Sequence, residues 1–368
     1  MSQRYAMMEE INEQVSLLRG LFEQRDSLCR EFVSLTKKHH FKKVLFVGNG
    51  SPYYAGYTLT FAAEKLLGAE AESIPAGIFG NHRKFDRSGT FHPDEILLVC
   101  PAESGHSKGQ VDAARRARAQ GICVMSTTLN PQGILAKTSD VVLGKPGKHE
   151  VAMAATKGQT MAIYMIFLNF LEAAYQNGKI SGDEYARYLS ACEKVPDNVE
   201  KTIHSTVEWF SKYRKRVMVA GQYFLLGFGA NYGTVQEAGL KFFECHGKPS
   251  MPLELEESLH GPFRGLGKKD MAFFVAAEEG AQRERMLTLA DAVKFCCDNR
   301  IILQNANREA RGDILPVYTS DVEFINAVEY LIPFQVLAFL IADALDIDLT
   351  VPLVAELDDV MLPAYEDD

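Results

Sequence analysis

Short apolar runs, each followed by a turn of small residues and then by a stretch with helical spacing, recur along the first half of the chain. Residues 44–47 form one run and residues 96–100 another, and residues 122–126 and 141–143 supply two more. Buried strands that alternate with helices at this spacing indicate βαβ units and a parallel sheet. The pattern therefore predicts an α/β fold with a doubly wound, flavodoxin-like sheet flanked by helices.

Three longer segments have the spacing of helices. Residues 7–39 place apolar residues three and four positions apart, as an amphipathic helix does. Residues 153–175 are the most apolar stretch, but polar residues interrupt it, so it falls short of the about 20 apolar residues that cross a membrane. Residues 182–214 form a polar helical bridge, with breaks expected at Asn177-Gly178 and Pro196-Asp197. We expect a buried helix at 153–175 and no membrane association.

The second half of the chain repeats the pattern of the first. A run at 217–220, followed by a turn and a helix through Glu244, matches the run at 44 with an offset of 173 residues, and two later runs match with offsets of 176 and 179. Similar offsets indicate an internal duplication. The predicted parts are a helical segment (1–40), a first α/β domain (41–180), a helical linker (181–214), a second α/β domain (215–350) and a tail (351–368).

Two loops of the first half carry small and hydroxyl-bearing residues where strands end. Ser104, Gly105 and Ser107 lie between a strand and a helix, and Gly50 and Ser51 follow the neighbouring strand. Serine hydroxyls, close approach of the backbone and the N–H groups of a helix N-terminus together favour a dianionic phosphate. We therefore expect these five residues to bind a phosphate group, although Ser107 alone would also serve as a plain helix cap.

Two observations limit the kind of ligand and the number of binding sites that we expect. A dinucleotide is the rival ligand, but Tyr53 stands where the third glycine of a GxGxxG loop would be. The corresponding loop of the second half, residues 276–279, contains two glutamates and would repel phosphate. One phosphate site per chain is expected.

The helix that opens the second half carries charged residues on one stripe. Glu237, Lys241 and Glu244 are spaced i, i+4 and i+7, among mostly apolar neighbours. A lysine enclosed beside glutamates forms a pair with a tunable pKa, and a carboxylate base is what enolisation beside a carbonyl or imine requires. His260, on a loop ended by Gly-Pro, can deliver protons near neutral pH. We expect Glu244 and Lys241 to be catalytic and Glu237 to contact the substrate. A lone loop histidine is usually incidental, so the expected catalytic role of His260 rests on the resemblance described below.

Composition excludes several other classes. A net charge of −9 without a basic stripe argues against nucleic acid, and seven cysteines without a CxxC pair indicate reduced thiols and no structural metal. The acidic N-terminus does not resemble a secretory signal. We expect a cytoplasmic protein with no metal and no cofactor.

The motifs EAGLKFFE and ESLHGP resemble those of the tandem sugar isomerase (SIS) family, over roughly residues 40 to 350. This family includes the isomerase half of glucosamine-6-phosphate synthase and the fructosamine-6-phosphate deglycases. The resemblance implies two tandem SIS domains, a proton carried between C1 and C2 of a sugar phosphate by Glu244, and a homodimer in which His260 completes the partner's site. It also implies phosphate contacts by Ser51, Ser104 and Ser107, and sugar contacts by Ala154, Ala155 and Thr156.

Departures from the family pattern favour one reaction. We expect no glutaminase domain before the first domain, and the residues at 351–368 include no lysine to engage the open sugar. Pro52 and Ala102 replace hydroxyl residues of the phosphate loops. We expect a deglycase that cleaves a ketosamine 6-phosphate into hexose 6-phosphate and free amine. The alternatives are an aldose–ketose isomerase or deaminase of an amino-sugar phosphate, and a non-catalytic sugar-phosphate sensor.

Overall fold

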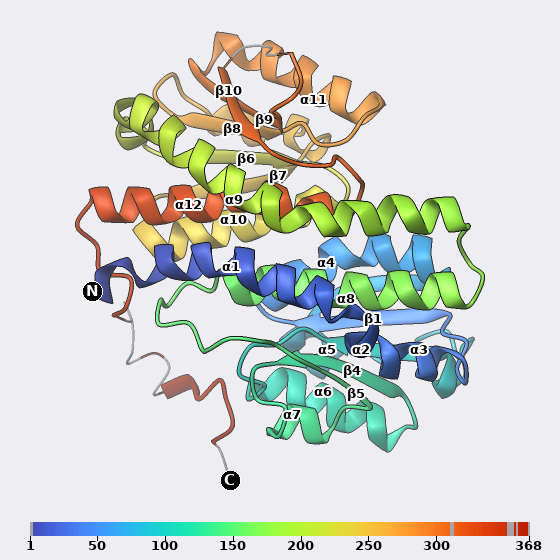
Figure 1. The fold of residues 1–368 in the computed structure, drawn as a ribbon. Helices are drawn as coiled ribbons and strands as arrows, with labels where there is room; N and C mark the ends of the chain where they lie inside the picture. The colour runs from blue at the N-terminus through green and yellow to red at the C-terminus, as the bar shows by residue number, and fades with distance from the viewer. Residues whose placement is uncertain (1–2, 310–312, 352–356, 358–359, 367–368) are drawn as a thin grey trace. The chain divides into compact units, whose positions relative to one another are not determined.

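The computed structural model describes residues 3–309, 313–351, 357 and 360–366. It divides into two compact units, described separately below (Figure 1). The first unit contains residues 17–150, 157–192 and the described part of 352–366. The second unit contains residues 3–16, 151–156 and 193–351. Half of the predicted tail, residues 352–356, 358–359 and 367–368, lies outside the described residues.

Five parallel strands form the sheet of the first unit, in the order β2-β1-β3-β4-β5. Because β1 and β3 are neighbours, the chain winds outward from the middle of the sheet in both directions. The strands are β1 (Lys43–Gly48), β2 (Glu70–Pro75), β3 (Ile96–Cys100), β4 (Cys123–Thr128) and β5 (Val141–Gly144).

Helices cover both faces of this sheet. Successive side chains of a strand point to opposite faces, so Leu45 and Val47 pack against α5, α6 and α7, whereas the Phe46 ring meets Phe170 of α8. The helices of the first unit are α2 (Arg25–Leu28), α3 (Arg30–Thr36), α4 (Ser51–Ala62) with its π-helical continuation η2 (Ala63–Leu67), α5 (Ala76–His82), η3 (Pro93–Glu95), α6 (Lys108–Ala119), α7 (Ile134–Lys137) and α8 (Lys157–Gln176).

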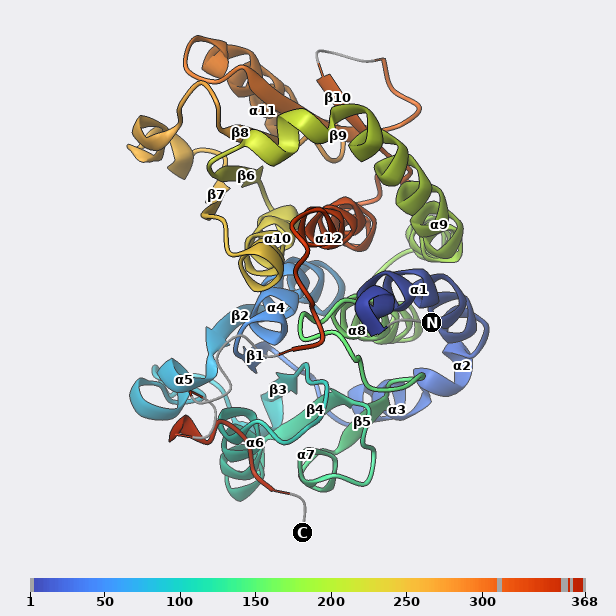
Figure 2. The same cartoon turned by 90° about the vertical axis from the view of Figure 1, so that its left-hand side faces the viewer.

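The sheet of the second unit has the order β7-β6-β8-β9-β10, again all parallel. Helices α10 and α12 lie side by side on one face, as Figure 2 shows, and α11 packs on the other. The strands are β6 (Tyr223–Gly227), β7 (Ser250–Glu254), β8 (Met271–Val275), β9 (Asn299–Asn305) and β10 (Asp313–Val317). The helices are η1 (Gln3–Tyr5), α10 (Ala230–His246), η4 (Glu257–Leu259), η5 (Pro262–Gly265), α11 (Ala281–Ala292), η6 (Val293–Phe295) and α12 (Asn326–Ala344).

The two units repeat one topology, which confirms the predicted pair of doubly wound α/β domains. Gly50 before α4 has φ 59° and ψ −132°, and Gly229 before α10 has φ 52° and ψ −135°. Such a backbone favours glycine, which has no Cβ to clash. The two glycines are therefore equivalent, and the offset between the first strands is 179 residues, not the 173 expected from the sequence.

That error arose because the predicted strand at 217–220 is wrong. Val217 to Val219 are the last residues of α9 (Gly182–Val219). The strand begins at Tyr223, six residues after its predicted start at Val217. Val217 is fully buried and Val219 is 64% exposed. Residues two apart share a face in a strand but lie on opposite faces of a helix, so the burial pattern identifies a helix.

Three helix boundaries also differ from expectation. Pro196 lies inside α9 without ending it, although a proline removes one backbone hydrogen bond. The predicted helix at 7–39 is three helices, α1 (Ala6–Glu23), α2 and α3, and residues 153–156 precede α8 rather than opening it. The expected break after α8 is confirmed, since Gly178 takes a φ of 67°.

Helix α12 is the one helix of the described residues that is long and apolar enough to cross a membrane, with a mean hydropathy of 1.6. Of that stretch, 83% is buried inside the protein. Core helices commonly have this composition, so the helix is weak support for a membrane span.

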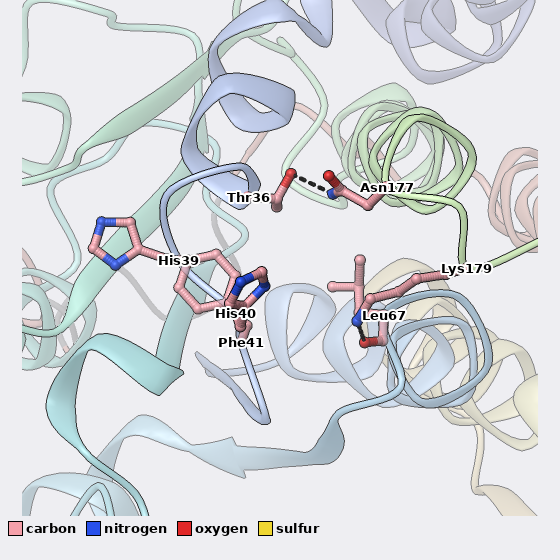
Figure 3. Close-up of a pocket in the computed structure, with 7 residues that line it drawn as sticks. All are labelled: Thr36, His39, His40, Phe41, Leu67, Asn177 and Lys179. Carbon is pink, nitrogen blue, oxygen red and sulfur yellow. Dashed lines mark hydrogen bonds between the residues drawn. The ribbon is translucent and has the colours of Figure 1, made fainter.

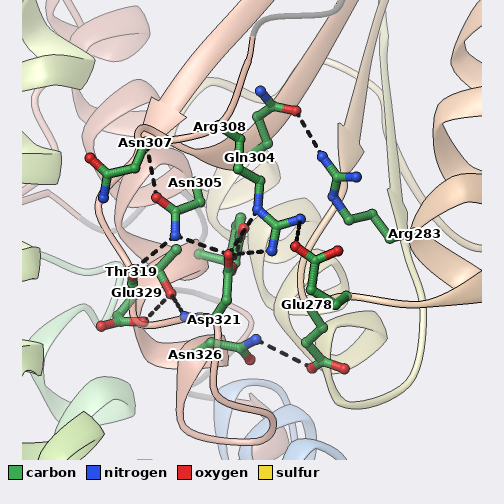
Figure 4. Close-up of polar contacts among 12 residues, drawn as sticks. Glu278, Arg283, Gln304, Asn305, Asn307, Arg308, Thr319, Asp321, Asn326 and Glu329 are labelled. Carbon is green, nitrogen blue, oxygen red and sulfur yellow. Dashed lines mark hydrogen bonds and ion pairs between the residues drawn. The ribbon is translucent and has the colours of Figure 1, made fainter.

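Polar side chains fill the edge of the second sheet where β8, β9 and β10 end (Figure 4). Arg308 pairs with Asp321 and with Glu279, each at 2.6 Å, and Glu278 accepts a bond from Asn326 at the start of α12. Glu278 and Asp321 hold left-handed backbone conformations, with φ of 62° and 51°. Such conformations cost free energy outside glycine, so this edge is strained and is held by its own ion pairs.

A buried glutamate lies beside this network. Glu329 accepts hydrogen bonds from Asn198 at 2.6 Å and from Thr319. Burial raises the pKa of Glu329 to about 8 despite these bonds, and the nearby Asp321 carboxylate adds to the rise. The carboxyl group is therefore mostly protonated at neutral pH.

Replacing Glu329 should change the pH dependence of stability. The folded pKa lies above the unfolded value of 4.5, so the stability from this group is complete below pH 4.5 and is lost as pH rises through 8. By linkage the loss amounts to at most about 5 kcal/mol. Glu329→Gln should flatten the fall between pH 5 and 9 in urea unfolding followed by the fluorescence of Trp209, whereas the exposed control Glu309→Gln should not. An unchanged slope in Glu329→Gln would contradict the assignment.

Candidate active site

The predicted phosphate loops follow β1 and β3, at the carboxyl edge of the first sheet. These two strands are neighbours, so both loops lie at the point where the winding of the sheet reverses, which is where ligands bind in folds of this kind. Gly50 caps α4, and Ser51 begins that helix with its side chain buried. A Cβ on Gly48 would lie 2.5 Å from the ring of Pro52. The loop therefore turns tightly into α4 and aims the helix N-terminus at this edge.

The second loop presents hydroxyl groups that do not cap its helix. Ser107 stands at the cap position of α6, is exposed and makes no side-chain capping bond, so the plain-cap interpretation does not describe it. The Ser104 hydroxyl accepts a bond from the N–H of His106 at 3.3 Å. Gly105 has a φ of 79°, and a Cβ there would lie 2.9 Å from the Thr128 hydroxyl. Only glycine fits at this turn.

Described tail residues pair with this loop. The Lys108 N–H donates to the Pro363 carbonyl at 3.0 Å, and the Tyr365 N–H donates to the His106 carbonyl at 2.8 Å. The Tyr365 hydroxyl also donates to Asp112 at 2.8 Å. The tail thus fixes the backbone of the loop and takes up one N–H group at the start of α6.

A buried ion pair supports the loop from behind, and the sequence analysis did not find it. The Lys145 Nζ, on a side chain only 2% exposed, lies 2.5 Å from a Glu103 oxygen and donates to the Gly158 carbonyl at 2.8 Å. Burial lowers the pKa of Lys145, although Glu103 opposes the shift. The Glu103 carbonyl also accepts a bond from the Leu129 N–H. A lysine directly after a buried strand was the signal available in the sequence.

Two further side chains, the buried Gln110 and the half-buried Glu150, make hydrogen bonds at this part of the first unit. The amide of Gln110 on α6 donates to the Val47 carbonyl at 3.1 Å and to the Pro101 carbonyl, at the ends of β1 and β3. The Glu150 carboxylate accepts bonds from the Lys157 and Gly158 N–H groups and so caps α8. These groups hold the edge in place, and a carboxylate at a helix N-terminus is electrostatically favourable.

In the second unit, Glu237, Lys241 and Glu244 form an ion cluster on α10. The Lys241 Nζ lies 3.3 Å from a Glu237 oxygen and 2.5 Å from a Glu244 oxygen. The Glu237 and Lys241 side chains are each 1% exposed and that of Glu244 is 35% exposed. Burial alone would lower the pKa of Lys241, but the two carboxylates outweigh it and raise the pKa. Lys241 is therefore a permanent ammonium, and Glu244 is the member of the cluster that reaches solvent.

His260 lies elsewhere in the second unit, at the end of the short helix η4 that follows β7. Its side chain is exposed, and its N–H donates to the Glu257 carbonyl. Helix α10 starts where β6 ends, and Glu244 comes fourteen residues after Ala230, which is about 21 Å along a helix. Since β6 and β7 are parallel, His260 lies near the carboxyl edge of the sheet, and Glu244 lies toward the amino edge.

The segment with Ala154, Ala155 and Thr156 packs with the second unit. Gln335 of α12 donates to the Thr156 carbonyl at 3.1 Å, and the Glu10 carboxylate of α1 accepts bonds from the N–H groups at 151 and 152. The structure thus brings this segment together with α1 and α12. Glu10 and Gln335 were not predicted, because their roles depend on contacts far apart in the sequence.

In the part of the chain that the structure describes, no group of three or more histidine, cysteine, aspartate or glutamate residues has the arrangement of a metal site.

No family model matches the chain. Comparisons with individual proteins, however, agree with one another. The chain is 23% identical over 362 residues to the glutamine–fructose-6-phosphate aminotransferase (isomerizing) of Gloeobacter violaceus, which covers 95% of this chain but 57% of that protein. The chain thus spans little more than half the length of this relative.

Two solved structures share the fold over nearly their whole length. A protein of Clostridium difficile 630 described as a phosphosugar isomerase superposes with a TM-score of 0.83 at 19% identity, covering 98% of this chain and 99% of that one. The C-terminal domain of the Francisella tularensis glucosamine-fructose-6-phosphate aminotransferase gives 0.80 at 18% identity, covering 94% and 98%. Together with its repeated sheets, these similarities show that the chain has the fold of these proteins, two tandem α/β domains, as its motifs predicted.

Proposed function

We propose that the protein is a phosphosugar enzyme that moves a proton between C1 and C2 of its substrate. The observation that carries this proposal is the ion cluster on α10, in which a fully buried ammonium holds a partly exposed carboxylate. On this helix the buried Glu237 and Lys241 hold the accessible Glu244 carboxylate in one orientation. A carboxylate held in this way is suited to act as a general base. The names of the aminotransferase and the phosphosugar isomerase agree with this chemistry.

Glu244 is the base in this proposal. It takes a proton from the sugar carbon that bears the amine, C1 of a ketosamine 6-phosphate, and the electron pair forms an enaminol. Return of a proton at C2 gives an imine at C1, and addition of water to the imine releases the amine and an aldose 6-phosphate. Lys241 stays protonated and stabilises the negative charge, and His260 delivers protons to nitrogen or to the ring oxygen.

The phosphate group binds at the carboxyl edge of the first sheet. Ser51, Ser104 and Ser107 supply hydroxyl groups there, and Gly50 and Gly105 let the backbone approach. Binding energy from a group remote from the reacting carbons fixes the geometry of the reaction. Ala154, Ala155 and Thr156 contact the sugar, and Glu237 orients Lys241.

A homodimer completes the site. Glu244 and His260 lie toward opposite edges of one sheet, which favours a site in which His260 serves the Glu244 of a second copy. Large apolar side chains are exposed near both residues and on the edge strand β7 between them: Phe243, Met251 and Leu259. Exposed apolar side chains along this edge of the sheet favour a subunit contact there.

Among the possible reactions we favour the deglycase, followed by isomerisation or deamination of an amino-sugar phosphate. We also propose that the enzyme acts in the cytoplasm. A sensor is disfavoured by the ion cluster, because ligand binding alone does not require an oriented base.

Replacing the proposed base tests the enzyme against the sensor. Glu244→Gln should retain binding of fructoselysine 6-phosphate by calorimetry but lose turnover by roughly a hundredfold or more. The matched control Glu193→Gln, at an exposed position of α9, should keep both. If wild-type protein leaves ketosamine 6-phosphates intact but interconverts hexose 6-phosphates, the deglycase is wrong and the isomerase stands.

Mixing two inactive variants tests the shared site. Glu244→Gln and His260→Asn should each be inactive alone. After dissociation and reassociation, half of the dimers are mixed and each has one intact site, so activity should return to roughly a quarter of wild type. A mixture as inactive as its components would show that both residues act within one chain.

A further inference from the structure

A cavity of about 140 Å³ lies in the first unit (Figure 3). It is lined by residues at the ends of α3, η2 and α8, namely Thr36, His39, His40, Phe41, Leu67, Asn177 and Lys179. These segments precede β1 and β2 or follow α8, so the cavity lies at the amino edge of the sheet. The serine loops follow strands and lie at the carboxyl edge. The cavity is therefore separate from the proposed phosphate site.

The titratable groups that line this cavity are all basic: His39, His40 and Lys179. Lys37 and Lys38 flank it and are exposed. The segment at 37–43 reads Lys-Lys-His-His-Phe-Lys-Lys, in a chain of net charge −9. A concentration of positive charge against the overall balance of the protein indicates an anionic ligand.

Nearby acids are engaged with other partners. Glu95 lies 2.5 Å from Lys42, and Asp94 lies 2.6 Å from the His92 ring. Asp94 also interacts with His39 electrostatically. The carboxylates beside the segment thus neutralise part of its charge, but the cavity itself has no acidic lining residue.

Some of the residues that line the cavity make hydrogen bonds to the ends of neighbouring helices, and this role explains their presence. The Lys179 Nζ donates to the Leu67 carbonyl, and the Asn177 amide donates to the Thr36 hydroxyl at 2.9 Å. Cations at helix C-termini are stabilising, and this accounts for Lys179. It does not account for an open volume beside the ammonium, or for two histidines on the same cavity.

The groups around the cavity suit a phosphate. A volume of about 140 Å³ leaves room for a phosphate group, which has five heavy atoms. The Lys179 ammonium has two N–H groups beyond the one bound to Leu67, and imidazoles add further donors. Burial lowers the pKa of Lys179, and a bound anion would restore the charged form.

We infer that this cavity binds a dianionic phosphate group as a second anion site, distinct from the serine loops. Lys179 and His40 hold the anion. His40, Asn177 and Lys179 are exposed at the mouth, so the rest of a small phosphomonoester extends into solvent. The inference does not depend on the proposed function.

Labelling of lysine amines in the full-length protein tests the site. Lys179 should react more slowly with acetic anhydride when inorganic phosphate or glycerol phosphate is present, as measured by mass spectrometry, and the stronger protector identifies the natural form of the ligand. Lys84, exposed in the same unit, is the control and should be unaffected. His40→Gln should weaken the protection about tenfold in phosphate concentration, the loss expected for one charge-assisted hydrogen bond.

A second variant separates this site from the serine loops. Ser107→Ala should keep the protection of Lys179 unchanged, even if it abolishes substrate binding. Lack of protection in the wild-type protein, or equal protection in His40→Gln, would show that the basic residues serve only the helix ends and would overturn the inference.

Discussion

The parallel arrangement of the strands is the constraint on which the rest of this structure depends. It places every strand end of a unit at one edge, so the connecting loops and helix N-termini gather there. The duplication supplies this edge twice. In the first unit glycines and serines occupy it, with Lys145 and Glu103 behind them. In the second unit Arg308 fills the same edge through ion pairs with Asp321 and Glu279, so the two copies differ in the side chains that they place at this edge.

The two buried lysines, Lys145 and Lys241, differ in their electrostatic surroundings. Lys145 contacts one carboxylate, that of Glu103, while Glu150 acts on it from farther away, and burial lowers its pKa. Lys241 contacts two, and its pKa is raised. The pKa values shift in opposite directions because a different number of carboxylates contacts each ammonium and offsets its lost hydration. Lys241 is thereby fixed as an ammonium and positions Glu244, while Lys145 supports a loop backbone.

Much of the fold was predictable, and the errors have physical causes. Central strands are continuous apolar runs because both faces are buried, and the run at 96–100 was located to the residue. Edge strands β2, β7 and β10 were missed, since they are polar or contain a proline. The stripe on α10 was predictable because helical spacing alone brings Glu237 to Lys241. The partners of Lys145 and of residues 151–156 were not, because they come together only through folding.

The central claim is that a proton leaves C1 and another arrives at C2 of a phosphorylated sugar. The direct measurement uses a ketosamine 6-phosphate that carries two deuterium atoms at C1, with NMR analysis of the product. The account predicts an aldose 6-phosphate that keeps one deuterium at C1, the other having moved to C2 or to solvent. A ketose 6-phosphate that retains both deuterium atoms at C1 would contradict the account, because the amine would then have left without proton transfer.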